Sequence, residues 1–437
     1  MLCLYLPLPR FENTQVAAIF QQAGSGEARS DIELFIGEGE SVDAERNQSE
    51  ERAPGTFVGN VGEPLRLAHI TPLEGFSGET AIGGQQVRVW TRLALTSENP
   101  LFHRIVNSFR DALAHMTQQN HIAVNIETAN TLLFVMKADQ SAELWLDTAA
   151  VMVEAVAKRA IGAGHVVFED DIADVIAIKF PGVGIQPTDR VLCIHREGWG
   201  FALAFDFNPD GNFDLVEFGR ALGTLSRTIR YRHIYELIEN SAIFDELMAA
   251  GWFPFVEILG REIKLLSDFA TVTDGLEQVE PRILAAFDQA RIDRIYDRWL
   301  TKPHFASRAT ILKTGLDAFA RGDSIACIKT LLTEIEGILN DAYRTAHGGR
   351  GARIKVLLSW VIERATARAG LPNTLMFPAS FARYLEQHTF ANFDPAADTG
   401  HAGSRHAVGH GAASENTYTP VRALQVILAL DQLMFYT

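Results

Sequence analysis

The chain has 437 residues, of which 47% are hydrophobic and 21% are charged. This length suits two to four domains, and this composition excludes an intrinsically disordered or low-complexity protein. Thirty-nine Lys and Arg stand against 54 Asp and Glu, and the formal net charge of −15 excludes a surface that is basic throughout.

The charge is distributed unevenly along the chain. Residues 300–437 contain 14 Lys and Arg against 11 Asp and Glu, a balance of +3, so the preceding part carries 25 against 43, or −18. Such an asymmetry indicates separate modules with separate partners. A local basic site in the last third of the chain therefore stays open.

The first 220 residues are predicted to form an acidic domain with a mixed α/β sheet. Runs rich in β-branched and aromatic residues predict its strands, and a polar stretch without periodicity predicts an exposed loop at 38–55. The predicted strands are 32–36, 87–95, 131–136, 174–180, 190–193 and 200–207.

Two helices are predicted inside this domain. Leu101, Ile105, Phe109 and Leu113 recur at helical spacing. Ser141 is a good N-cap residue and glycines follow at 162 and 164, which predicts a second helix over 141–161.

Beyond Asp214 the pattern is almost entirely helical. Asp214 and Glu217 resemble a capping box, and the aromatic residues around Pro254 are expected to fill a core between helices. We expect a helical connector over 221–300 and a helical bundle over 301–437, so the predicted fold class is α+β. The predicted helices are 214–232, 234–250, 281–300, 307–321, 324–343, 354–369 and 380–387, and a final one from Pro420.

Cysteine content and hydropathy predict a cytoplasmic protein without a membrane anchor. Cys3, Cys193 and Cys327 have no C-x-x-C spacing, so they predict neither a disulfide framework nor a zinc ribbon. No apolar run reaches the roughly 18 to 20 residues that span a bilayer.

The candidate catalytic motif lies just before the final helix. Arg405 and His410 are separated by four residues on a short helical turn that glycines 409 and 411 end. Thr419 as N-cap and Pro420 at the first helical position then begin the last helix, which has an apolar stripe.

This segment resembles the HEPN superfamily, in which an Arg, four to six residues and a His precede the last helix of a small helical bundle. The segment 403–437 is also similar to HEPN-like proteins of bacterial phage-defence and abortive-infection loci. The helix 330–339, with Glu334 and Glu336, looks like the acidic helix that packs against the family's motif. Ser404 stands where the family usually has a polar residue such as Asn.

The resemblance implies a metal-independent endoribonuclease that acts as a homodimer on RNA. His410 would be the general acid or base, and Arg405 would hold the phosphate, because imidazole titrates near neutrality and guanidinium stays charged. Ser404 and His406 would be auxiliary residues, and Tyr418 would contact the substrate. The acidic front would recognise a trigger or protein partner, or restrain the nuclease.

A non-catalytic reading stays open. Arg405 would then pair with Glu334 or Glu336, His410 would cap a helix, and the bundle would be a scaffold for dimerisation or for binding RNA or a partner. The sequence alone does not decide between the two readings.

Two metal sites also compete with this interpretation. Asp206, Asn208, Asp210 and Glu217 match the donor positions of an EF-hand calcium loop, but the preceding residues alternate like a strand. The same residues fit a polar turn followed by a helix cap.

His401, His406 and His410 lie within ten residues but lack the Glu of an H-E-x-x-H motif, so we expect no metal and no cofactor.

Overall fold

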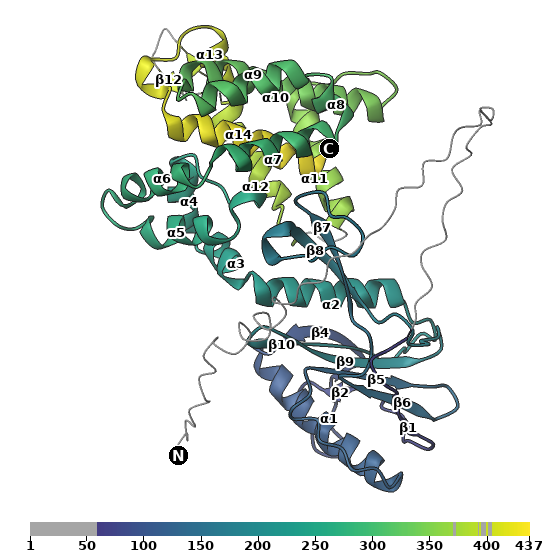
Figure 1. Ribbon diagram of the computed structural model, residues 1–437. Helices are drawn as coiled ribbons and strands as arrows, with labels where there is room; N and C mark the ends of the chain where they lie inside the picture. The colour runs from purple at the N-terminus through teal and green to yellow at the C-terminus, as the bar shows by residue number, and fades with distance from the viewer. Residues whose placement is uncertain (1–58, 370–372, 392, 395–398, 401–403) are drawn as a thin grey trace, which may run out of the picture. The chain divides into compact units, whose positions relative to one another are not determined.

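The computed structural model describes residues 59–369, 373–391, 393–394, 399–400 and 404–437. The predicted strand at 32–36 and the predicted loop at 38–55 lie outside these residues. Within them the chain is α+β with a helical C-terminal region, as predicted (Figure 1). In the described residues, no helix is long and apolar enough to cross a membrane.

A six-stranded antiparallel sheet forms the first structural layer. Its strand order is β1-β6-β5-β9-β10-β4, and a two-stranded ladder joins β2 to β3. These strands are β1 (Leu65–Leu67), β2 (Phe76–Ser77), β3 (Val89–Trp90), β4 (Arg92–Thr96), β5 (Thr131–Met136), β6 (Ala142–Leu146), β9 (Arg190–Glu197) and β10 (Gly200–Asp206).

One helix covers each face of this sheet. Phe134 and the other even-numbered residues of β5 pack towards α1 (Pro100–Gln119), whereas Leu133 and Val135 pack towards α2 (Leu215–Arg230) (Figure 1). Side chains alternate between the faces of a strand, so a strand that is covered on both sides is apolar along its whole length. This explains why every residue of β5 is buried.

The predicted helix over 141–161 is wrong. Residues 142–146 form β6, and Ala142–Leu146 pairs with β5 after a tight turn in which the Asp139 carboxylate accepts hydrogen bonds from Ser141. Met152–Ala157 forms β7, which pairs with β8 (Ile172–Lys179). Ser141 suits a turn as well as an N-cap, and β-branched valines at 151, 153 and 156 favour the strand.

The connector is made of short helices rather than two long ones. The predicted helix 234–250 breaks at Asn240, whose side chain caps the second half, and Pro281 lies inside a helix instead of beginning one. The elements are α3 (Arg232–Glu239), α4 (Ser241–Ala249), η2 (Val256–Ile258), α5 (Arg261–Phe269), α6 (Gly275–Ala285) and α7 (Gln289–Leu300). Trp252, Phe253 and Phe255 are fully buried, as the sequence predicts.

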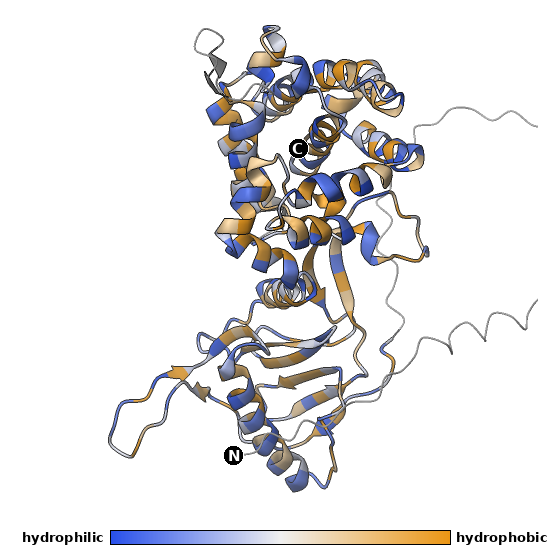
Figure 2. Ribbon diagram, turned by 90° about the vertical axis from the view of Figure 1, so that its left-hand side faces the viewer, coloured by the Kyte–Doolittle hydropathy of each residue, from blue (hydrophilic) through white to orange (hydrophobic). Residues whose placement is uncertain are grey.

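The C-terminal region follows the predicted helices closely, and α11 and the start of α14 fall where they are expected. Figure 2 shows hydrophobic and hydrophilic residues alternating along the helices. The elements are α8 (Pro303–Ala306), α9 (Ala309–Ala320), α10 (Ser324–Ala346), α11 (Ile354–Ala369), α12 (Pro378–Tyr384), η3 (Leu385–Thr389), β11 (Phe393–Asp394), β12 (Thr399–Gly400), α13 (Arg405–Gly409), η4 (Glu415–Thr417) and α14 (Pro420–Tyr436).

The last helix is buried more completely than its predicted apolar stripe requires. Every residue from Arg422 to Tyr436 is buried. The polar members are satisfied internally; for example, the Asp431 carboxylate accepts from Arg298 at 2.7 and 3.0 Å and from Trp299 at 3.0 Å. A helix contacted on all sides therefore forms the centre of the C-terminal core.

The β7–β8 hairpin packs into this core. Ala173 and Val175 of β8 belong to the same buried cluster as α14. The buried Asp174 carboxylate binds Arg227 of α2 at 3.2 Å and the Thr374 hydroxyl before α12. The hairpin thus joins the first part of the described chain to its helical end.

Candidate functional site

The short helix α13 displays the predicted motif. Ser404 is its N-cap: the buried Oγ accepts a hydrogen bond from the backbone N–H of Ala407 at 3.3 Å. At the other end, Gly411 has φ +70°, a conformation that favours glycine and ends the helix. Ala407 and Val408 are buried and anchor the helix, so the remaining side chains face outward.

Arg405 is paired with one of the two predicted acidic residues. Its guanidinium lies 2.7 Å from the Glu336 carboxylate of α10, and the two side chains are 40% and 30% exposed. The expected packing of the acidic helix against the motif is therefore found. Partly exposed ion pairs of this kind stabilise a fold by at most about 1 kcal/mol, so this arginine can exchange partners.

The two histidines of the motif contact each other at the surface. His406 and His410 are exposed, and their ring centroids lie 4.5 Å apart at 68°. They are one helical turn apart, which places both imidazoles on the same side of α13. Arg405, His406 and His410 thus all belong to the short helix α13 and its C-cap, with the two imidazoles exposed and the arginine partly exposed.

Of the other predicted residues, Tyr418 contacts α10, the helix that carries Glu336, whereas Glu334 has a different arginine as its partner. The Lys329 ammonium of α10 lies 5.5 Å from the centre of the Tyr418 ring, and partial burial raises the pKa of the tyrosine. Glu334 instead binds Arg308, which also binds Asp341 at 2.6 Å. Ser404 is buried and its hydroxyl caps α13.

Sequence reasoning missed Lys329. Lys329 and Glu336 are seven residues apart on α10, two helical turns, and therefore lie on the same face. This seven-residue spacing in the sequence could have identified Lys329 as a neighbour of the motif on the face of Glu336. We name the set of Lys329, Glu336, Arg405, His406, His410 and Tyr418 the α13 site; it contains three contacts, Lys329 with Tyr418, Glu336 with Arg405 and His406 with His410.

The calcium-loop interpretation is wrong. Asp206 ends β10 and its carboxylate accepts from Arg92 at 2.7 Å, while Asp210 binds the same guanidinium at 3.2 Å. The Asn208 amide donates to the carbonyls of residues 187 and 189, and Glu217 binds Arg220 on α2. The polar-turn interpretation is confirmed, because the Asp214 side chain caps α2.

No alternative metal site is found in the described part of the chain, where no group of three or more His, Cys, Asp or Glu side chains can hold an ion. His401 lies outside the described residues. Cys193 and Cys327 are buried and unbonded, and burial raises the pKa of the Cys327 thiol to about 12.

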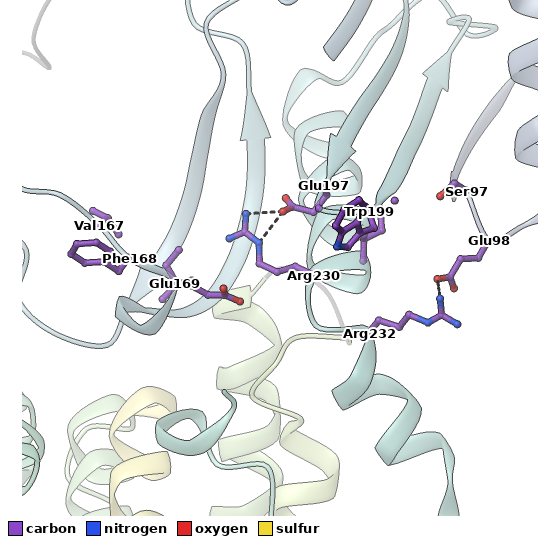
Figure 3. A pocket seen from close by; sticks show the side chains of 13 residues that line it. Ser97, Glu98, Val167, Phe168, Glu169, Glu197, Trp199, Arg230 and Arg232 are labelled. Atoms are coloured by element: carbon purple, nitrogen blue, oxygen red, sulfur yellow. Dashed lines mark hydrogen bonds and ion pairs between the residues drawn. The ribbon is translucent and has the colours of Figure 1, made fainter. Parts of the chain in front are cut away.

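A separate pocket of about 870 Å³ opens between the β9–β10 turn, the β7–β8 loop and the end of α2 (Figure 3). Its wall includes Trp199, which is 94% exposed, and Phe168. The Arg230 guanidinium donates to Glu197 at 2.9 and 3.0 Å, and Arg232 pairs with Glu98 (Figure 3). Engaged arginines beside exposed aromatic rings suit binding rather than proton transfer.

Comparison of the chain with models of protein families, with curated proteins and with solved structures gives no match. The chemistry proposed for the α13 site and for the pockets therefore rests on the residues that form them.

Proposed function

We propose that the protein is a metal-independent endoribonuclease of the HEPN type, with its active centre at the α13 site. The observation that carries this proposal is the exposure of Arg405, His406 and His410 together on one anchored helical turn. RNA cleavage through attack of the ribose 2′-hydroxyl needs a group that moves protons and a cation that holds the phosphate. Imidazole and guanidinium supply these two functions.

The ion pair between Arg405 and Glu336 supports a positioning role for the carboxylate. Glu336 of α10 holds the guanidinium of Arg405, a residue of the same short helix as His406, in the absence of substrate. A phosphodiester offers the planar fork of donors an alternative anion, and the weak surface pair costs little to break. Lys329, seven residues before Glu336, adds a positive charge on the same face of α10.

RNA is the proposed substrate and a second copy of the chain is the proposed partner, as the family resemblance implies. In such a dimer two α13 sites would meet across a two-fold axis, where each surface contacts its own counterpart. The same resemblance is the basis for proposing a cytoplasmic role in phage defence or toxin–antitoxin action. The pocket lined by Trp199 and Phe168 is the proposed contact for a protein partner or trigger.

Cleavage of RNA by the purified full-length protein in the presence of EDTA tests the proposal. We expect products with 2′,3′-cyclic phosphate ends, and a loss of rate of about 10²-fold or more for His410→Ala and for Arg405→Ala. The exposed residues His115 and Arg282, far from α13 in the chain, provide matched controls as His115→Ala and Arg282→Ala. If the wild-type protein cuts no RNA, or if both variants cut as fast as the controls, the proposal is wrong.

A non-catalytic scaffold for dimerisation or binding is the second candidate function. The pairing of Arg405 with Glu336 favours it, because an internally satisfied arginine has a structural role without any substrate. Light scattering and RNA-binding measurements on the same variants separate the two. A scaffold predicts dimers or RNA binding without cleavage, and loss of dimer stability in Arg405→Ala.

A further inference from the structure

A second pocket, of about 570 Å³, lies between the β7–β8 hairpin and the helices α5 and α7. It lies apart from the α13 site, since no residue is common to the two. The charged residues of its lining are Lys158, Arg159, Asp170, Asp171, Glu257, Arg261, Glu262, Asp288, Arg291, Arg294 and Arg298.

Most carboxylates of this pocket are already occupied. Arg291 binds Glu257 at 2.8 Å and Glu262 at 2.6 Å, and Arg298 binds Glu257 at 2.8 Å. Asp171 is held by the Arg159 guanidinium, and Asp288 caps α7 by accepting from the Arg291 backbone N–H. Three carboxylates thus have arginine partners, and Asp288 has a backbone N–H donor.

Three cations remain. In the described part of the chain, the side chains of Lys158, Arg261 and Arg294 form no hydrogen bond or ion pair. Asp170 and Asp288 are the carboxylates of the lining that bind no cation directly. The side chains without an ionic partner therefore carry three positive charges against the two negative charges of Asp170 and Asp288, and the whole lining has six cations and five carboxylates.

Lys158 is the least solvated of the three cations. Burial lowers the pKa of its ammonium, and the attraction of Glu257 and Asp170 acts in the opposite direction. Removing water from a cation costs free energy unless a counter-charge replaces the water. The Lys158 ammonium has lost part of its water and has no close anion among the described residues, so a bound anion would offset this cost.

We propose that this pocket binds a phosphate group of a small phosphorylated ligand. Lys158 supplies a compact charge, and Arg261 and Arg294 supply planar forks of donors that match phosphate oxygens. The amino end of α5 opens into the same space, where Gly260 provides no side-chain cap for the backbone N–H groups. The volume admits a nucleotide-sized molecule.

The ligand would act on the helical core through an existing network of ion pairs. Arg298 donates to the backbone carbonyl of Lys158 at 2.7 Å and to the Asp431 carboxylate of α14. Occupation of the pocket therefore stabilises the junction between the β7–β8 hairpin and α14 and raises the melting temperature.

Calorimetric titration of the full-length protein with inorganic pyrophosphate, and separately with a nucleoside triphosphate, tests the site. We expect both to bind, and Lys158→Met and Arg294→Met each to weaken binding about tenfold, the effect of one lost charge-assisted hydrogen bond. Arg282→Met, an exposed arginine outside the pocket, is the matched control and should bind as the wild type does. Methionine retains the apolar stem, and unchanged melting temperatures of the unliganded variants verify the fold.

Asp170→Asn gives a second test with the opposite sign. Removal of the unpaired carboxylate should tighten pyrophosphate binding severalfold, since the carboxylate repels an anion.

A nucleoside triphosphate that binds more tightly than pyrophosphate identifies a nucleotide as the ligand, and equal affinities identify the phosphate groups alone. Absence of binding at millimolar pyrophosphate and triphosphate, equal affinity in wild type, Lys158→Met and Arg294→Met, or binding of a 5′-phosphorylated RNA oligonucleotide alone would overturn the proposal. Because the readout is binding, these outcomes are independent of RNA cleavage.

Discussion

Arginines with very different surroundings show how burial decides the part that one side chain plays. Arg227 is fully buried and binds Asp174, Val175 and Asn373, whereas Arg405 is 40% exposed and binds one carboxylate. A buried guanidinium that loses its partners cannot recover water, but an exposed one can. The first residue is therefore structural, and the second can exchange its partner for another anion.

Arg227→Met should destabilise the fold by about 3 to 5 kcal/mol, because it leaves the buried Asp174 carboxylate without its counter-charge. Arg220, on the same helix, pairs with Glu217 at the surface, and Arg220→Met should cost at most about 1 kcal/mol. Urea denaturation of both variants measures the difference. Equal costs would show that the buried pair contributes no more than the exposed one.

His304 should make the helical region sensitive to acid. Burial lowers the pKa of its imidazole to about 4, and its ring is 2.7 Å from the Thr437 hydroxyl. The unfolded chain, with a pKa near 6.5, binds the proton more readily, so this contribution is complete above about pH 6.5 and is lost as the pH falls towards 4. His304→Gln should therefore show a smaller fall in melting temperature between pH 7 and 5 than the wild type. His115→Gln, which alters an exposed histidine of α1, should leave that fall unchanged.

At the scale of elements, the β7–β8 hairpin lies in close contact with α2. Gly219 and Gly223 face β8, and a Cβ at Gly223 would lie 2.6 Å from the Cα of Ala177 and from the carbonyl oxygen of Ile176. Both obstacles are backbone atoms, which cannot rotate away. The two glycines therefore set the distance between helix and hairpin.

Gly223→Ala should destabilise the protein by about 1 to 3 kcal/mol, as overpacking does. Helix propensity alone predicts the opposite sign, a gain of up to about 1 kcal/mol, so the direction of the change separates the two effects. Thermal unfolding measures it. Gly83→Ala, at a position with open space around the missing Cβ, is the control and should change little.

At the scale of the whole molecule, the helical core includes residues from the front of the chain. Ala173 and Val175 of β8 are buried in the same cluster as α10 and α14, and Asp174 binds the Thr374 hydroxyl. The helices after residue 220 therefore depend on a hairpin that precedes them by about fifty residues. The predicted boundary at 220 crosses this cluster.

A chain that begins at residue 221 should lose cooperative unfolding or melt well below the full chain, because it exposes the surface that β8 covers. Calorimetry of the two chains provides the measurement. A truncated chain that is as stable as the full chain would show that the hairpin adds nothing to the core. The result also decides whether the acidic front can be deleted to test restraint of the α13 site.

Local signals in the sequence were enough where the determinant is itself local. The caps Asp214 and Thr419, the glycine that ends α13 and the apolar β5 segment predict their elements correctly, since each acts on neighbouring residues. The non-catalytic interpretation offered Glu334 or Glu336 as the partner of Arg405, and the structure pairs Arg405 with Glu336.

Contacts between segments that are far apart in the sequence decided the elements and sites that local signals did not predict. Residues 142–157 became strands because β5 and β8 offered partners, and α14 is buried on all sides because several helices and a hairpin surround it. Lys158, Arg261 and Arg294 line one pocket although more than a hundred residues separate the first from each of the other two. Hydrogen-bond partners and burial depend on which segments meet in space, and only the tertiary structure supplies that information.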